Sequence, residues 1–155
     1  MKVKPEIRQK AMHFLKNNNV MALATIGEDG KPQVAVVYYA IDSEFNFYVS
    51  TRKKTRKFRN ILKNPDVSFT IGTGPKVITI QGGGEAEWSE EKANKFVWSL
   101  IENFDIIKVS IRWPLRILPH KDVVVIKIKP NWMILLDLEG GVPIEDYEVN
   151  FQRVL

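Results

Sequence analysis

The chain has 155 residues and no cysteine, which excludes disulfides, thiolate metal sites and cysteine nucleophiles. Its hydrophobic content of 45% and charged content of 26% are ordinary for a soluble globular protein, so we expect one domain over residues 1–155. The only two histidines lie far apart in the sequence, and no metal site is expected. The N-terminus lacks the apolar segment of a secretory signal. No apolar run approaches the ~20 residues that a transmembrane helix needs, and we expect a cytoplasmic protein without a membrane segment.

The first predicted elements are a helix and two strands. Residues 5–17 place apolar side chains on one helical face, with proline at a first helical position, and predict an amphipathic helix. Residues 20–26 are an apolar run short enough for a buried strand. The pair Asp29-Gly30 predicts a hairpin turn into a strand at 33–42. This strand is apolar throughout, so we expect the barrel core on one side and a ligand or partner subunit on the other.

The next stretch concentrates the positive charge. After a turn at 42–44 and a strand at 45–50, residues 51–64 carry seven basic side chains and no acidic one. The whole chain has a formal net charge of +5, so the remainder sums to −2. A strand that delivers the hydroxyls of Ser50 and Thr51 to the start of a short basic helix is typical of a phosphate site. The alternatives are a solvated basic helix face and a weak nucleic-acid patch.

The second half begins with further strands. Residues 67–72 and 77–80 predict two of them, and the second runs into Gly82–Gly84. Three glycines in a strand context indicate a bulge or a close approach of two backbones. Ser89 and the acidic residues after it predict the start of a largely buried helix that extends to residue 104.

The remaining segments complete the fold prediction. Residues 106–120 fit no element, residues 122–129 and 132–138 predict two strands, and the tail after Gly141 is expected to be irregular. With about six or seven strands, mostly in hairpins, and three helices, the sequence favours an α+β fold built on a small antiparallel β-barrel.

The order of short motifs in residues 22–71 resembles the FMN-binding split barrels of the pyridoxamine 5'-phosphate oxidase-like superfamily. A strand ending in Ala-Thr is followed by a D-G-x-P hairpin, a V-x-V-V-Y strand, an F-Y strand and a hydroxyl-Arg-Lys triplet. An Asn-Ile pair and an N-P-x-V-S run complete the pattern. Residues 80–87 and 127–130 extend it, so that the resemblance covers about residues 10–138.

The resemblance implies a homodimer that holds FMN in a groove between its subunits. It places the backbone of residues 35–38 beside the isoalloxazine ring and residues 48–51 along the ribityl chain and phosphate. Thr55, Arg56 and Lys57 match the triplet that grips the phosphate, which agrees with the phosphate site expected above. The cofactor-binding residues predicted in this way are Ala35, Val36, Val37, Tyr38, Tyr48, Val49, Ser50, Thr51, Lys54, Thr55, Arg56, Lys57, and, toward the flavin of the other subunit, Ile78 and Ile80.

The residues that bind the substrate in the true oxidases of this superfamily have no counterpart in this sequence. Where those enzymes have an arginine before the apolar strand and a lysine after it, this chain has Ala35 and Ala40. Where they have a tryptophan on the last strand, it has Leu136, and no R-x-H segment follows. Vitamin B6 oxidation is therefore not assigned, and no catalytic residue is predicted.

The function that the sequence favours is FMN binding, in a flavin-dependent oxidoreductase or electron carrier with an unidentified small-molecule substrate or electron donor. Relatives with the same fold bind a deazaflavin or haem, and haem would require His13 or His120 as its axial ligand. Other classes are a non-enzymatic nucleic-acid-binding barrel and a flavin-free dimeric scaffold. The charge of −2 outside the basic stretch argues against nucleic acid, whose domains spread basic residues along a whole face.

Overall fold

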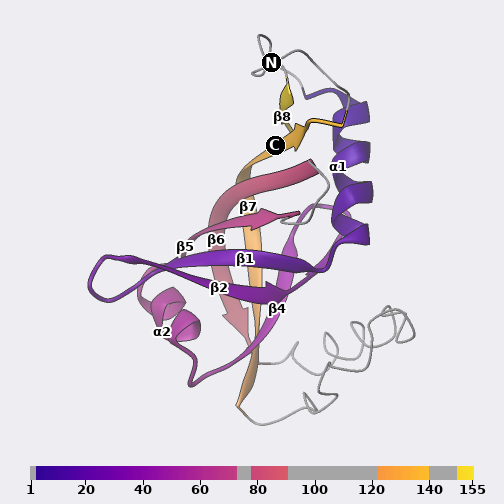
Figure 1. Cartoon of the computed structure of the whole chain (residues 1–155). Coiled ribbons are helices and arrows are strands. Elements are labelled where there is room, and N and C mark those ends of the chain that lie inside the picture. Colours follow the sequence, from indigo (N-terminus) through magenta and orange to yellow (C-terminus); the bar gives the residue numbers. More distant parts are fainter. Residues whose placement is uncertain (1–2, 73–77, 91–121, 140–149) are drawn as a thin grey trace.

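A computed structural model describes residues 3–72, 78–90, 122–139 and 150–155. It contains two helices and eight strands (Figure 1). In chain order they are α1 (Pro5–Asn17), β1 (Val20–Ile26), β2 (Pro32–Tyr38), β3 (Ala40–Ile41), β4 (Phe47–Arg52), α2 (Arg56–Lys63), β5 (Asp66–Ile71), β6 (Ile78–Ser89), β7 (Val123–Asp137) and β8 (Phe151–Arg153). Within this described part of the chain, neither helix is long and apolar enough to cross a membrane.

The strands form one antiparallel sheet in the order β2-β1-β5-β6-β7-β4-β3, with β8 added beside β7. Although β2 begins this order and β4 lies near its end, the two strands approach within 8 Å between Cα atoms. They are not hydrogen-bonded neighbours in the sheet, so the sheet, whose curl is visible in Figure 1, is not closed by pairing between β2 and β4 and is split there. The predicted α+β antiparallel split barrel is confirmed.

The split has a boundary at each end. At one end the chain passes directly from β2 to β3 through Tyr39, whose backbone N–H donates to the carbonyl of Asn19 (2.9 Å). The Tyr39 hydroxyl donates to the carbonyl of Leu15 in α1 (2.8 Å). At the other end β4 leads into α2, which packs against β1 and buries Phe58 and Ile61 in the core.

The predicted hairpin at Asp29-Gly30 is confirmed, with Gly30 at a φ of +75° and β1 paired along its whole length with β2. The single strand predicted at 33–42 is wrong, because the chain changes pairing partner, from β1 to β4, at Tyr39. The strand predicted from residue 45 begins at Phe47, since Phe45 has a φ of +67° and belongs to the turn.

The two strands predicted at 122–129 and 132–138 are one strand, β7, which continues through Pro130. The register between β6 and β7 shifts between Gly83 and Gly84, so that Asn131 is an extra residue and the proline sits at a bulge, where it is tolerated. A Cβ at Gly84 would overlap the Lys129 carbonyl. The bulge and close backbone approach expected at the glycines are confirmed.

Ser89 ends β6 rather than starting a helix. The predicted helix that follows it, and the segment 106–120, lie outside the described residues. The tail expected to be irregular contains β8, which pairs with β7.

Candidate cofactor-binding site

The basic stretch places the start of α2 directly after β4. Thr55 is the residue before the helix, and its side chain does not cap it. Instead its hydroxyl donates to the carbonyl of Arg52 (2.9 Å). The first turn of α2 contains no acidic residue. No side-chain acceptor therefore caps the positive end of the helix dipole, and the first-turn amides can bind an anion.

Three of the predicted side chains form a hydrogen-bonded chain beside this helix start. The Thr51 and Thr55 hydroxyl oxygens are 3.0 Å apart, and Lys57 Nζ lies 3.5 Å from Thr51 Oγ1, to which it donates. Because the Thr55 proton points to the Arg52 carbonyl, the Thr51 hydroxyl donates to Thr55 and accepts from Lys57. The two hydroxyls thus link the ammonium group of Lys57 to the end of β4 and to the start of α2.

Lys57 is a partly desolvated cation. Its side chain is about half buried, and this burial lowers its pKa, since a low-dielectric surrounding disfavours the charged form. Among the described residues, the ion pairs within 4.0 Å do not include Lys57. An anion at the start of α2 would give this ammonium the counter-charge that it lacks there.

The other basic side chains fall into two groups. Lys53 pairs with Glu90, and Lys63 pairs with Glu28 (2.9 Å), where the hydrogen bond from Lys63 lowers the pKa of Glu28. The remaining four are exposed and have no ion-pair partner among the residues that the structure describes; they are Arg52, Lys54, Arg56 and Arg59.

Strand β2 contributes a backbone edge to the split. The backbone N–H of Gly27 donates to the carbonyl of Lys31 (2.8 Å), and that of Tyr39 donates to the carbonyl of Asn19. These two bonds show which residues of β2 direct their backbone groups toward β1, namely every second residue counted from Lys31 to Tyr39. The backbone groups of Val34 and Val36 consequently point away from β1, toward the split. Their side chains lie on the outer face of the sheet and are 68% and 71% exposed. This edge offers backbone hydrogen-bonding groups next to apolar surface, which suits one edge of a planar heterocycle.

Strand alternation divides the four residues predicted to line the ribityl chain. Val49 and Thr51 point toward the barrel interior and are buried, whereas Tyr48 and Ser50 lie on the other face of β4. The Tyr48 hydroxyl donates to Asp42 Oδ2 (3.0 Å). Burial, together with this bond, raises the pKa of Tyr48 to about 12. Only one of the two pairs can present its side chains to the same ligand.

The structure brings Thr51, Thr55 and Lys57 together and leaves the two isoleucines predicted on β6 apart from them. Ile80 is fully buried in the core, and Ile78 packs against it. Both belong to a strand separated from β2 by β1 and β5. Their predicted contact was with the flavin of a second subunit, and it stays a prediction.

Two residues beside the site, Asn60 and Gln33, were not predicted as site residues, although Asn60 belongs to the Asn-Ile pair of the family pattern. Asn60 of α2 is 2% exposed, and its side-chain amide donates to Gln33 Oε1 of β2 (2.9 Å). The available signal was a polar residue three positions after Lys57, on the same face of a helix that also carries core residues.

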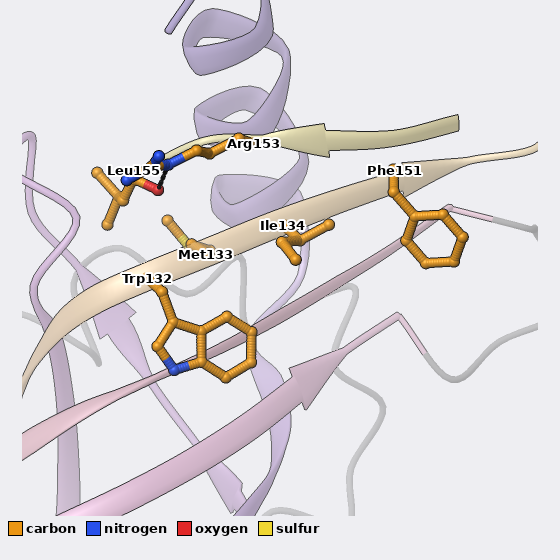
Figure 2. Close-up of a pocket in the computed structure, with 6 residues that line it drawn as sticks. All are labelled: Trp132, Met133, Ile134, Phe151, Arg153 and Leu155. Carbon is orange, nitrogen blue, oxygen red and sulfur yellow. Dashed lines mark hydrogen bonds between the residues drawn. The ribbon is translucent and has the colours of Figure 1, made fainter. Parts of the chain in front are cut away.

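A second hollow, of about 200 Å³, lies away from the start of α2, over strands β7 and β8 (Figure 2). The side chain of Trp132 covers Gly83, where a Cβ would lie 2.6 Å from the indole nitrogen. Arg153 donates through Nε to the carbonyl of Leu155 (2.7 Å). The residues that line the hollow are Trp132, Met133, Ile134, Phe151, Arg153 and Leu155. It is mostly apolar and offers far fewer phosphate-binding donors than the start of α2.

The sequence profile of the pyridoxamine 5'-phosphate oxidase family matches residues 7–136. The chain belongs to this family. The match includes both walls of the split and the whole of α2, and it confirms the family that the motif order indicated. Of the two histidines named as alternative axial ligands for haem, His13 is exposed on α1 beside Asn17, and His120 lies outside the described residues.

Individual proteins and solved structures are also similar to this chain. A 5a,11a-dehydrotetracycline/5a,11a-dehydrooxytetracycline reductase from Streptomyces rimosus is 31% identical over half of this chain, which spans 62% of that relative's length. A solved structure named F420 reductase is 25% identical, with a TM-score of 0.65 over 78% of this chain and 93% of that one. A pyridoxamine 5'-phosphate oxidase-related, FMN-binding protein from Nostoc punctiforme is 15% identical, with a TM-score of 0.65 over 91% and 89% of the two chains, and shares the fold.

Proposed function

We propose that this protein binds FMN and serves as a flavin-dependent oxidoreductase or electron carrier. The observation that carries the proposal is the chain from Lys57 through Thr51 to Thr55 at the uncapped start of α2. It combines a partly desolvated ammonium, hydrogen-bonded hydroxyls and helix amides, which are the groups that bind a phosphate monoester. The family and the FMN-binding relative with the same fold support it.

The residues of the site fit FMN in two parts. The phosphate would be held by Thr55, Arg56 and Lys57, with Lys54 exposed beside them. The edge of β2 at Val36 would hydrogen-bond the polar side of the ring. Bound FMN would supply the hydride or electron chemistry, and the protein its position and electrostatic surroundings.

A deazaflavin of the F420 type is the second candidate. The four exposed cations without ion-pair partners in the described part of the chain exceed what a single phosphate monoester requires. A longer phosphorylated tail would use more of them. The similar structure named F420 reductase supports this alternative.

The proposed assembly is a homodimer that packs the outer face of the sheet against a second copy. Val34, Val36, Trp132 and Phe151 are large apolar side chains with at least 41% exposure, and exposed apolar surface of this kind is typical of an interface. A dimer would cover these residues and would bring β6 of one subunit toward the split of the other.

The test is the visible absorption spectrum of the purified protein, followed by titration with FMN, riboflavin and F420. Bands near 370 and 450 nm, or saturable FMN binding that exceeds riboflavin binding, support the proposal. Tight F420 binding without FMN binding would support the second candidate. A colourless protein that binds neither FMN nor F420, carries excess absorbance near 260 nm and binds nucleic acid in a steeply salt-dependent way would instead support the nucleic-acid alternative.

The cytoplasmic location stays a prediction.

A further inference from the structure

One face of α2 connects the two walls of the split. Lys57 and Asn60 are three positions apart and therefore lie on the same side of the helix. Lys57 donates to Thr51 of β4, whereas the Asn60 amide donates to Thr25 Oγ1 of β1 (2.9 Å) and to Gln33 Oε1 of β2 (2.9 Å). The helix is thus hydrogen-bonded to strands on both sides of the gap at the end opposite Tyr39.

The two bonds of Asn60 use both hydrogens of one amide group, so its orientation is fixed. Asn60 and Thr25 are each 2% exposed, and water cannot readily replace a lost partner there. A buried, fully satisfied polar group of this kind specifies one arrangement of the elements that it joins. Phe58 and Ile61 hold α2 against the core by apolar contact, which resists separation but permits sliding more readily than directed hydrogen bonds do.

We propose that Asn60 is a positioning residue that sets the distance between the phosphate-binding start of α2 and the ring-binding edge of β2. The inference rests on the proposed function. In this proposal Asn60 does not contact the ligand. It keeps the two binding points at the distance that FMN requires. A ligand anchored at both points then binds more tightly than one anchored at the ring alone, because the second contact forms at a high effective concentration.

The dissociation constant of riboflavin divided by that of FMN measures how well the two binding points are spaced for FMN. Riboflavin lacks the phosphate but retains the ring and the ribityl chain, so its affinity should depend much less than that of FMN on where α2 starts. A substitution that only destabilises the fold leaves both affinities of the folded protein, and hence the ratio, unchanged. A substitution that displaces α2 from β2 lowers the ratio.

The experiment uses Asn60→Leu, Gln33→Met and the double variant, with Thr25→Ser as the control that keeps the hydroxyl acceptor. Gln33 is only partly buried, so Gln33→Met folds even if Asn60→Leu does not. We expect the ratio to fall about fivefold in Gln33→Met, as the loss of one hydrogen bond implies, and at least as far in Asn60→Leu, which loses the bonds to both Thr25 and Gln33. The double variant should lose no more than Asn60→Leu alone, because that variant already lacks the bond to Gln33. Thr25→Ser should retain the wild-type ratio.

The preference of the wild-type protein for FMN over riboflavin separates an error in the phosphate site from an error in the role of Asn60. If wild-type protein binds FMN no better than riboflavin, the phosphate site itself is wrong. If wild type shows a clear preference for FMN and Gln33→Met and Asn60→Leu keep it, Asn60 has a structural role only, and the proposed positioning is overturned.

Discussion

Two surfaces of this barrel offer themselves to a ligand, and they differ in chemistry. The start of α2 combines a half-buried lysine, two threonine hydroxyls and uncapped helix amides. The hollow over β7 and β8 is lined mostly by apolar groups. Because charge-assisted hydrogen bonds recognise phosphate and exposed apolar surface favours protein contacts, the first surface suits a phosphorylated cofactor and the second suits a protein partner.

The largest effect is expected at the proposed dimer face, which includes Val34 and Val36 of β2 as well as Trp132 and Phe151 beside the hollow. Val36→Lys places a charge on the proposed dimer face, and an unpaired buried charge costs about 3 kcal/mol or more, roughly a 100-fold weaker dimer. Analytical ultracentrifugation without flavin should show dissociation at concentrations where wild type is dimeric. Leu62→Lys is the matched control, since Leu62 of α2 is 53% exposed and lies outside that face. Equal behaviour of the two variants would mean that this face is not the interface.

The next prediction compares the loss of a positive charge at the phosphate site with the loss of one elsewhere on the same helix. Lys57→Ala should weaken FMN binding about 10- to 100-fold, the range expected for a charge-assisted hydrogen bond, and leave riboflavin binding unchanged. Lys63→Ala, at the far end of α2 where the lysine pairs with Glu28, should alter FMN affinity little. An equal loss in both variants, measured by flavin fluorescence, would point to general electrostatic attraction instead of a site.

A smaller effect tests which face of β4 the cofactor uses. Thr51→Val removes the hydroxyl that orients Lys57 and should weaken FMN binding about threefold to tenfold. Ser50→Ala changes the adjacent residue on the opposite face of the strand and should have little effect. The reverse ranking in the same titration would place the ligand on the face of Tyr48 and Ser50.

The smallest effect is a pH dependence. Burial lowers the pKa of Lys57 in the folded protein, so above pH 7 the affinity for FMN should fall as pH rises through that lowered pKa. The stability of the flavin-free protein should change in the opposite direction over the same window, because the unfolded chain there binds more protons than the folded one. Lys57→Arg keeps its charge and should show a flat affinity profile; a decline as steep as that of wild type would exclude Lys57 as its source.

The sequence predicted the parts of this molecule that depend on local patterns. The Asp29-Gly30 hairpin, the amphipathic helix before it and the grouping of hydroxyls with basic residues after β4 are all encoded within a few positions. The motif order was sufficient to identify the family and the split barrel. Thr51, Thr55 and Lys57 were predicted and are in contact.

The parts that were missed depend on residues distant in sequence. Pro130 remains inside β7 because of a bulge opposite Gly83 and Gly84, which no local signal at the proline reveals. Asn60 became recognisable as a positioning residue only when Thr25 and Gln33 were seen beside it. The division of residues 48–51 between two faces follows from alternation, but which face lies inward required the fold.

Amide NMR can locate the bound phosphate directly. Spectra of the protein with FMN and with riboflavin should differ chiefly at the amides of Thr55, Arg56, Lys57 and Phe58, because only FMN carries the phosphate. Differences centred on Ile134 and Arg153, with the start of α2 unchanged, would place the phosphate at the apolar hollow and contradict the account.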